Sequence, residues 1–455
     1  MTTEDKVPVI SCSSEFTAVP QHEWYLTKKA LAFGRYRATG TVMKKKHQSQ
    51  KPTRCKLSIL RQICNYIPNH LVPQLARETG VEEDARTYTP WSHVLTLLFA
   101  QLTHSLGLND VCDALALHSG PLSAIRGATA PKRNTLSHAN RKRDPVMAEK
   151  LFWQTLEHLQ NLCPGFGRGR RRRFAFRFKR MIHLVDSTTL QLVANCMDWA
   201  KHRRRKAAAK CHLRLNLQSF LPRFAIVDTA RHSDAKKAWE LCAGLLAGEI
   251  VIFDKAYLDL LHLFELFKRG VSWVTRAKEG MQFRVVRRYQ RGRIGNILRD
   301  DVVQMKSSAS RRLYPAWLRR IVAMVEVDGK WREMEFLSDN LEWSAQTIVD
   351  LYRCRWDIEV FFKEIKQTLQ LADFLGHNAN AVRWQVWMAL LTYVLLRFCA
   401  WISKWGHSFT RLFTLLRSAL WMKLDLRSFL ESYGIAGGSF RFLGAPEQAY
   451  LPGIP

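Results

Sequence analysis

The sequence predicts an α/β protein, with a mixed β-sheet at its centre and helical segments on either side of it. Three observations predict this fold class. Residues 57–162 show helical spacing, residues 181–275 alternate strand-like apolar runs with helices, and residues 377–435 are helical again. A chain of 455 residues is also too long for one compact core, so we expect two to four domains.

The first segment, residues 1–56, lacks helical or strand periodicity, and we expect a disordered extension. We expect Met43 to be the natural start, so that deletion of residues 1–42 leaves activity intact. The helical region at 57–162 follows. Its helix starts are indicated by Thr89–Pro90, Asn109, Asn134 and Pro145.

Two basic segments bear on the partner of the chain. Residues 133–143 are polar and basic, which fits either a helix resting on DNA or a solvated surface. Residues 165–180 alternate arginines, including Arg170–Arg173, with Phe174, Phe176 and Phe178. This run is expected to contact phosphate, and its aromatic residues fit either base stacking or an edge strand.

Charge points to a polyanionic partner. The formal net charge is +31, and phosphate neutralisation makes nucleic acid the simplest partner, with an acidic membrane surface as the alternative. The ten cysteines include no C-x-x-C pair, which indicates reduced thiols in a cytoplasmic protein without a structural zinc. The apolar stretch 384–396 is shorter than the roughly 20 residues that cross a bilayer, so we expect a buried helix.

The central sheet is predicted from apolar runs and alternation. Strands are expected at 181–185, 211–218, 223–228, 249–253 and 271–275, and helices at 233–246, capped by Ser233, and 258–269, closed by Gly270. Residues 278–340 change to a β-rich insertion, with strands at 283–288, 321–327 and 331–337 and a turn at Asp328–Gly329. Ser344 then caps one long helix, and a helical C-terminal region occupies 401–455.

Three acids form the candidate site. Asp186 and Asp254 each follow an apolar strand, and Glu359 lies on the long helix. Phosphodiester chemistry with two divalent ions needs carboxylate ligands from separate elements, and three acids at one end of a sheet meet that need. Taken singly, a strand-terminal aspartate is more often a helix N-cap. The histidines at 183, 202, 212 and 232 have no metal-ligand spacing and are interpreted as structural or close to DNA.

The long helix adds three side chains to the acid. Tyr352, Arg355, Glu359 and Lys366 share one face, roughly 60° wide at about 100° per residue. A phenol, a guanidinium and an ammonium beside one carboxylate suit a metal ligand placed next to phosphate contacts. Each of them alone is an ordinary residue of a helix surface.

The spacing Y-x2-R-x3-E-x6-K of these four residues resembles the signature of the DDE transposases of the bacterial insertion-sequence type four family. Asp186 and Asp254 fall where the first two acids of that family stand, and the stretch 336–340 is similar as well. The resemblance covers about residues 57–400. It implies an RNase H-like catalytic domain at 163–400, with the β-rich insertion at 278–340, preceded by a helical DNA-binding domain at 57–162.

The resemblance also implies Mg²⁺-dependent cut-and-paste transposition through a hairpin intermediate. Asp186, Asp254 and Glu359 would hold two Mg²⁺, with Mn²⁺ as a substitute, while Tyr352 and Arg355 would contact phosphates near the hairpin and Lys366 the terminal backbone. Terminal inverted repeats and target DNA would be the partners, bound by a homodimer in the bacterial cytoplasm at the nucleoid.

A tryptophan of the insertion would hold a flipped base in that family. Trp331 is the candidate in this chain, although core packing is the favoured interpretation of this residue. Two rival functions stay open: a stand-alone RNase H-type nuclease, and a DNA-binding protein with a vestigial site.

Overall fold

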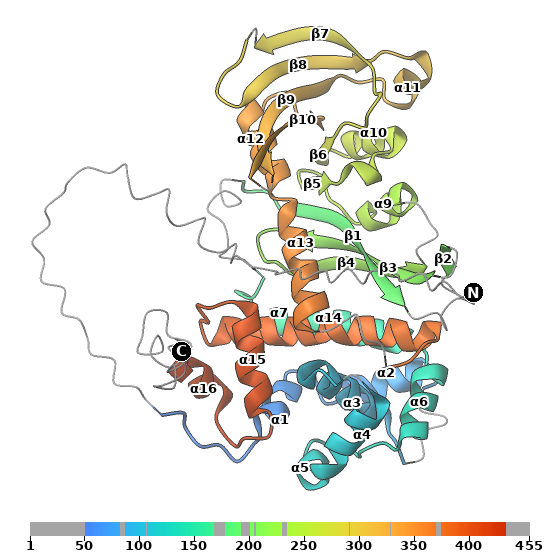
Figure 1. The fold of residues 1–455 in the computed structure, drawn as a ribbon, viewed down its shortest axis with the longest axis vertical. Helices are drawn as coiled ribbons and strands as arrows, with labels where there is room; N and C mark the ends of the chain where they lie inside the picture. The colour runs from blue at the N-terminus through green and yellow to red at the C-terminus, as the bar shows by residue number, and fades with distance from the viewer. Residues whose placement is uncertain are drawn as a thin grey trace, which may run out of the picture. The chain divides into compact units, whose positions relative to one another are not determined.

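The described part of the chain contains one mixed sheet and, below it in Figure 1, a group of helices that comes from both ends of the sequence. The computed structural model describes residues 51–81, 87–105, 107–167, 178–192, 201–203, 206–229, 234–290, 292–327, 329–369 and 375–433. The predicted extension at 1–50, Arg170–Arg173, Phe174, Phe176 and Ser233 therefore lie outside the described residues.

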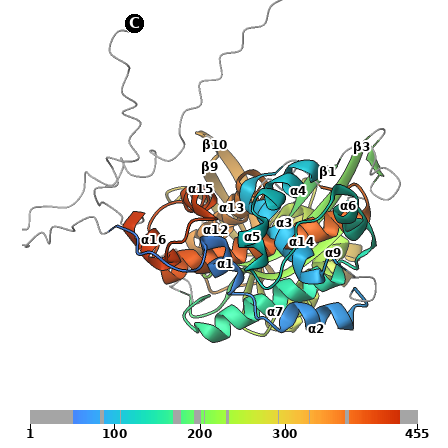
Figure 2. The same cartoon turned by 90° about the horizontal axis from the view of Figure 1, so that it is seen from below.

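The N-terminal helices surround one long apolar helix near the C-terminus, α14 (Ala379–Ile402). Figure 1 shows α14 alongside α7, and Figure 2 shows α3, α4 and α6 on its near side. By length and composition α14 could cross a membrane, but 83% of its most apolar window is buried inside the protein. The predicted buried helix at 384–396 is confirmed. These N-terminal helices are α1 (Ile59–Cys64), α2 (Leu71–Glu78), α3 (Pro90–Thr103), α4 (Leu108–Leu117), α5 (Ser119–Ser123), α6 (Arg133–Lys142) and α7 (Val146–Leu162).

Helix starts agree with the sequence in part. The Thr89 side chain accepts a hydrogen bond from Ser92 N, and Pro90 opens α3, as predicted. The N-caps of α4 and α6 are instead Gly107 and Lys132, so the predictions of Asn109 and Asn134 as caps are wrong. Both asparagines lie in the first turn of their helices, close to the predicted starts.

The first half of the sheet has the RNase H-like topology. Strand β1 pairs antiparallel with β3, β3 pairs antiparallel with β4, and β5 and β6 continue on the other side of β1 in parallel. Helices α9 (Asp234–Cys242) and α10 (Leu260–Lys268) are the crossovers. The strands are β1 (Ile182–Leu192), β2 (Lys201–Arg203), β3 (Lys206–Asn216), β4 (Pro222–Thr229), β5 (Ile250–Phe253) and β6 (Ser272–Arg276).

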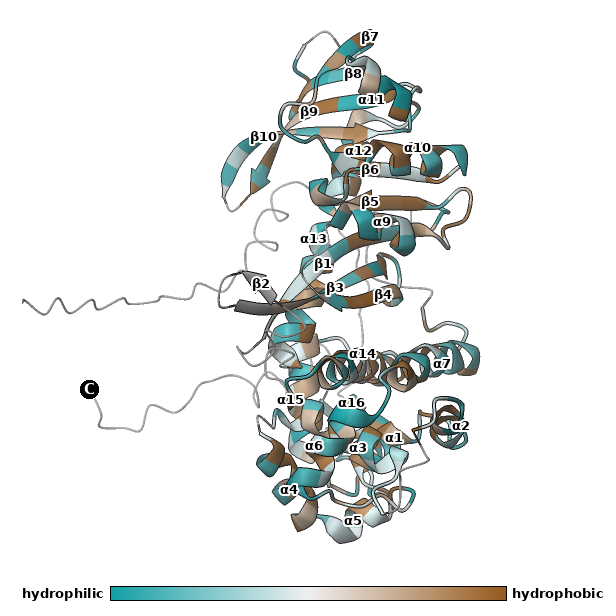
Figure 3. Cartoon of the chain, turned by 90° about the vertical axis from the view of Figure 1, so that its right-hand side faces the viewer, coloured by the Kyte–Doolittle hydropathy of each residue, from teal (hydrophilic) through white to brown (hydrophobic). Residues whose placement is uncertain are grey.

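Strand β5 is buried on both of its faces, and Figure 3 shows it in the brown of hydrophobic residues. Ile250 and Ile252 belong to the core shared with α12–α14, whereas Val251 and Phe253 belong to the core beneath α9 and α10. A strand that helices cover on both faces has a continuous run of apolar residues. This run is why the sequence predicted β5 to within one residue.

The insertion continues the same sheet. Its strands are β7 (Phe283–Gln290), β8 (Ile297–Met305), β9 (Leu318–Val327) and β10 (Lys330–Ser338), with α11 (Ser308–Leu313) between β8 and β9. Strand β10 pairs antiparallel with β6. The sequence did not predict β8, because Asp300 and Asp301 interrupt its apolar pattern. Both are buried, and Asp300 pairs with Arg319 of β9.

The predicted single helix after Ser344 is divided in the structure. Ser344 caps α12 (Ala345–Arg353) as expected, accepting a hydrogen bond from Thr347 N. The helix is interrupted at Cys354–Arg355, resumes as α13 (Trp356–Lys363) and ends in a π-helical turn, η6 (Glu364–Thr368). Cys354, Arg355 and Glu364 nevertheless keep right-handed helical backbone angles. Arg355 therefore still lies beside Tyr352 and bonds Glu359, although the helix that carries these residues is irregular.

The C-terminal helices α15 (Phe409–Ala419) and α16 (Leu426–Tyr433) also pack onto the core of α14. Arg54 forms an isolated β-bridge with Leu424, and Thr53 N donates to Ser428 Oγ at 2.9 Å. Residues 53–55 of the predicted extension therefore belong to the fold, since they pair with the segment at 423–428.

Candidate active site

Asp186 and Asp254 lie side by side on neighbouring parallel strands. Val185 of β1 is in register with Phe253 of β5, so the two aspartates are the next residues along each strand. Strand β5 ends there, but β1 continues to Leu192. The expectation that Asp186 ends its strand is therefore wrong: the polar residues after it pair with β3, which the apolar run alone did not reveal.

The Asp186 carboxylate is held by two donors. Ser187 N donates to Oδ1 at 2.7 Å, and Arg355 Nη1 donates to Oδ2 at 2.9 Å. Burial raises the pKa of Asp186 to about 6, against the opposing effect of the Arg355 guanidinium. Asp254 is half-buried and accepts from Ala256 N at 3.4 Å, which makes it the N-cap of the short turn η5 (Lys255–Tyr257).

Glu359 is joined to Asp186 through one guanidinium. Arg355 Nη2 donates to Glu359 Oε1 at 2.8 Å while its other terminal nitrogen bonds Asp186. The side chain of Arg355 is 9% exposed and that of Glu359 is 45% exposed. Arg355 has helical backbone angles, so its spacing of four residues from Glu359 places the two side chains together, while its other terminal nitrogen reaches Asp186 on β1.

Tyr352 and Lys366 are held by the protein on either side of this pair. Tyr352 is 4% exposed, its ring packs 5.1 Å from that of Phe336, and burial raises its pKa to about 12. Lys366 Nζ donates to the carbonyl of Thr189 on β1 at 2.7 Å. It lies in the π-helical turn η6, a distortion found often at functional sites.

The three acids offer carboxylate oxygens, the ligands that hard divalent cations prefer. Within the described ranges, however, no three side chains of the types that bind metals are close enough to hold an ion together. The Arg355 guanidinium contacts two of the three acids instead. The three carboxylates thus have the chemistry to bind a divalent metal ion. In this structure the Arg355 guanidinium neutralises two of them, Asp186 and Glu359.

A buried polar cluster next to the acids was not predicted. The Tyr257 hydroxyl lies 3.0 Å from His212 Nδ1, and Asp234 accepts from Lys210 Nζ at 2.6 Å and from Ser187 Oγ at 3.3 Å. His212 was interpreted only as structural or close to DNA. The sequence signal for Tyr257 was its position three residues after Asp254, but its partner comes from a strand paired far away in sequence.

Trp331, Phe178 and His183 were named in the sequence analysis and lie in different surroundings. Trp331 is 61% exposed at the start of β10, so the favoured interpretation of core packing is wrong. Phe178, from the arginine-rich run, packs edge-on against Trp343 with ring centroids 5.7 Å apart. His183 lies 3.4 Å from Glu249 in a buried contact away from the acids, in keeping with a structural role.

The chain is similar in sequence to known proteins. Residues 177–395 match the family model described as "Transposase DDE domain", and residues 56–125 match one described as "Domain of unknown function (DUF4372)". The chain is 29% identical to "Putative transposase y4zB" of Sinorhizobium fredii over 65% of this chain and 80% of that protein. It is 26% identical to "Transposase InsG for insertion sequence element IS4" of Escherichia coli, over 40% of this chain and 42% of that protein.

The chain is a DDE transposase of the IS4 type. A further relative, "Probable transposase for insertion sequence element IS5377" of Geobacillus stearothermophilus, is 26% identical over 50% of this transposase and 59% of its own length. The cryo-EM structure of a piggyBac transposase synaptic complex with hairpin DNA overlaps 87% of this chain and 86% of that one. Its TM-score is 0.42 at 9% identity, too low to add to the assignment. Divalent-metal dependence is general for the DDE domain.

Proposed function

We propose that this transposase binds the terminal inverted repeats of its insertion element and catalyses Mg²⁺-dependent strand cleavage and strand transfer, in a cut-and-paste reaction with a hairpin intermediate. One observation carries the proposal: two aspartates stand in register at the end of β5, and Arg355 joins the first of them to Glu359. Carboxylates gathered from two strands and a helix are what metal-assisted phosphodiester chemistry requires.

Asp186, Asp254 and Glu359 are the residues that would hold the metal, as two Mg²⁺ or two Mn²⁺. When bound, such ions make the attacking oxygen nucleophilic and stabilise the leaving oxygen. The protein contributes the placement of the ligands. The β1–β5 ladder fixes the two aspartates relative to each other, and Arg355 sets the distance of Glu359 from Asp186.

Arg355, Lys366 and Tyr352 have separate roles in this proposal. Arg355 and Lys366 would bind DNA phosphates by exchanging their present partners, the carboxylates and the Thr189 carbonyl, for phosphate oxygens. Tyr352 is buried against Phe336 and lies beside Arg355, with 5.9 Å between the guanidinium carbon and the ring centroid. Tyr352 would therefore position Arg355 by packing against it. It would contact the hairpin phosphates only after a rearrangement that exposes its side chain.

We propose DNA binding for the helical region 57–162 and catalysis for 163–400, with 401–455 as the C-terminal region. Synapsis of two element ends implies a homodimer on DNA. The net charge of +31 supports polyanion binding and a place in the bacterial cytoplasm at the nucleoid.

The test is incubation of the purified chain with Mg²⁺ and DNA that carries the element's own terminal repeats. Hairpinned ends followed by insertion into target DNA support transposition. Cleavage that does not depend on the terminal repeats supports a stand-alone nuclease. Binding without cleavage supports a DNA-binding protein with a vestigial site. Asp186→Asn, Asp254→Asn and Glu359→Gln should each abolish cleavage and retain binding. Glu279→Gln is the matched control, because that side chain is 99% exposed; retained cleavage in an acid variant removes that acid from the site.

A further inference from the structure

Helix α6 presents one side to the protein and the other to solvent. Its inward residues Leu136, Ala139 and Asn140 are buried. The exposed residues are Arg133, Asn134, Ser137, His138, Arg141 and Lys142. At about 100° per residue, Asn134, Ser137, His138 and Arg141 form an outer stripe roughly 100° wide, and Arg133 and Lys142 fall on its two shoulders.

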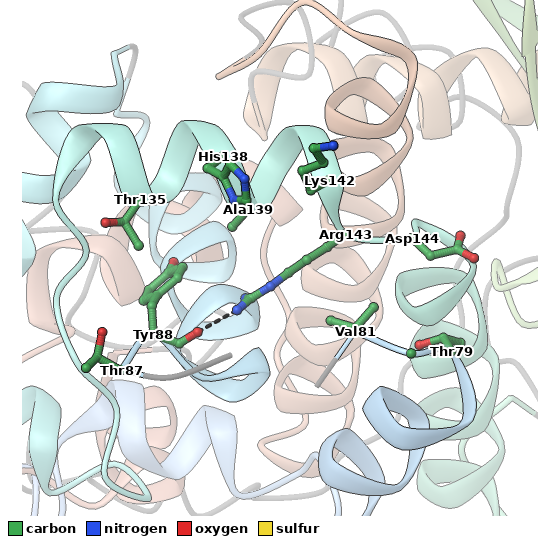
Figure 4. Close-up of a pocket in the computed structure, with 11 residues that line it drawn as sticks. Thr79, Val81, Thr87, Tyr88, Thr135, His138, Ala139, Lys142, Arg143 and Asp144 are labelled. Atoms are coloured by element: carbon green, nitrogen blue, oxygen red, sulfur yellow. Dashed lines mark hydrogen bonds between the residues drawn. The ribbon is translucent and has the colours of Figure 1, made fainter. Parts of the chain in front are cut away.

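The inward side of α6 is fixed to two other parts of the fold. Asn140 Oδ1 lies 2.8 Å from His93 Nε2 on α3, and Asn140 Nδ2 donates to the Leu375 carbonyl at 3.4 Å. Figure 4 shows Arg143, just after the helix, reaching toward the Tyr88 carbonyl beside a cavity of about 250 Å³. Polar anchors of this kind hold a helix in one orientation, which a surface that reads a partner requires.

The chemistry of the outer stripe is selective. From Lys132 to Arg143 there is no acidic residue and no exposed apolar side chain. The stripe offers an amide, a hydroxyl, an imidazole and a guanidinium, all of which form directional hydrogen bonds, while the shoulders offer two further cations, Arg133 and Lys142. A merely solvated basic surface needs charge but not this division between a hydrogen-bonding stripe and charged shoulders.

We infer that α6 is the helix with which this transposase reads DNA sequence. It would lie in the major groove, with Asn134 and Arg141 bonding base edges, because an amide matches adenine and a guanidinium matches guanine in two-bond pairs. Arg133 and Lys142 would contact phosphates on the two walls of the groove. The inference rests on the proposed binding of terminal repeats and names the element that supplies its specificity.

The test measures binding of the full-length chain, without metal, to two fluorescent duplexes: the element's terminal repeat and a scrambled duplex of the same composition. Asn134→Ala and Arg141→Ala should each weaken repeat binding about tenfold and leave scrambled binding nearly unchanged. Arg141→Lys keeps the charge but loses the planar fork, so it should lose the same preference. Arg133→Ala and Lys142→Ala should weaken both duplexes alike and lower the salt slope by about one.

Lys423→Ala is the matched control, since it removes a charge from an exposed residue remote from α6. If Asn134→Ala and Arg141→Ala lose affinity equally for both duplexes, or lose none for either, α6 does not read the DNA sequence. The proposed binding of the terminal repeat is unaffected by that result. If the unaltered chain does not distinguish the duplexes, repeat binding itself fails and the reading helix fails with it. Thermal unfolding midpoints within about 2 °C of the unaltered chain show that each variant is folded.

Discussion

The Tyr257 hydroxyl lies 3.0 Å from Nδ1 of His212, and this contact joins the turn that Asp254 caps to strand β3. His212 in turn stands opposite Ser187 in the β1–β3 ladder, one residue after Asp186. The two aspartates are therefore connected twice: by the parallel β1–β5 ladder and by a polar contact on the side of the sheet that α9 covers.

Tyr257→Phe should weaken metal binding without unfolding the protein. Loss of one buried hydrogen bond costs about 1 kcal/mol of stability, and loss of a residue that orients a metal ligand lowers affinity about tenfold or more. Mn²⁺ binding followed by electron paramagnetic resonance, in the absence of DNA, measures the effect. Tyr314→Phe is the control, since Tyr314 is also fully buried but packs against Trp273 under α10. Equal Mn²⁺ affinity in the two variants would contradict a positioning role for Tyr257.

Arg355→Lys should reduce single-turnover cleavage about a hundredfold. A lysine has one ammonium and cannot bond Asp186 and Glu359 through two separate nitrogens as the guanidinium does. Displacement of a catalytic group by about 1 Å costs a factor of this order. Arg353→Lys is the control, because Arg353 is 57% exposed and only pairs with Asp350 on its own helix. Cleavage by Arg355→Lys at the rate of the control would show that the shared guanidinium is dispensable.

Acid should destabilise the fold through His262. This imidazole is 2% exposed between Trp239 and Phe253, and burial lowers its pKa from 6.5 to about 4. Between these values the unfolded chain binds more protons than the folded one, so stability is full above pH 6.5 and falls as pH drops toward 4. At pH 4.5 the loss of folding stability is about 2–3 kcal/mol.

Urea unfolding at pH 7.5 and pH 4.5 measures this effect. His262→Phe keeps the ring packing but cannot be protonated, so its stability should fall less over the same interval. A pH dependence of the variant equal to that of the unaltered chain would assign the acid sensitivity to other groups.

Leu391→Ala in α14 should destabilise the whole described region together. Leu391 is fully buried, and a core leucine truncated to alanine costs about 2–5 kcal/mol. Because the N-terminal helices and the sheet share the core of α14, tryptophan fluorescence and circular dichroism should report one coincident transition at lower urea. Leu117→Ala, at an 83% exposed position, is the control and should leave the midpoint unchanged. Two separate transitions would show that the helical region unfolds independently.

Local signals predicted much of this fold. The Thr89 and Ser344 caps and the apolar strand β5 depend on short-range chemistry or on continuous apolarity, and each was placed within one residue. The buried helix predicted at 384–396 exists, but α14 extends several residues beyond both of those ends. The three acids were chosen from the Y-x2-R-x3-E-x6-K spacing around Glu359, taken together with the positions of Asp186 and Asp254 after apolar strands.

Contacts between distant segments could not be predicted in this way. Strand β8 was missed because Asp300 is compensated by Arg319, nineteen residues later in the chain. The helix break at Cys354–Arg355 was missed because the sequence there contains neither proline nor glycine. The pairing of Tyr257 with His212 depends on strand register, which no local pattern of either residue encodes.

The pairing of β10 with β6 has a mechanical consequence. Strand β6 is the neighbour of β5, so the insertion and the strand leading to Asp254 belong to one continuous ladder of hydrogen bonds. We expect a load applied at the exposed Trp331 end of β10 to pass through β6 to β5, the strand that precedes Asp254. Contacts that a partner makes on the insertion would then reach the proposed metal-binding carboxylates through the hydrogen bonds between these strands.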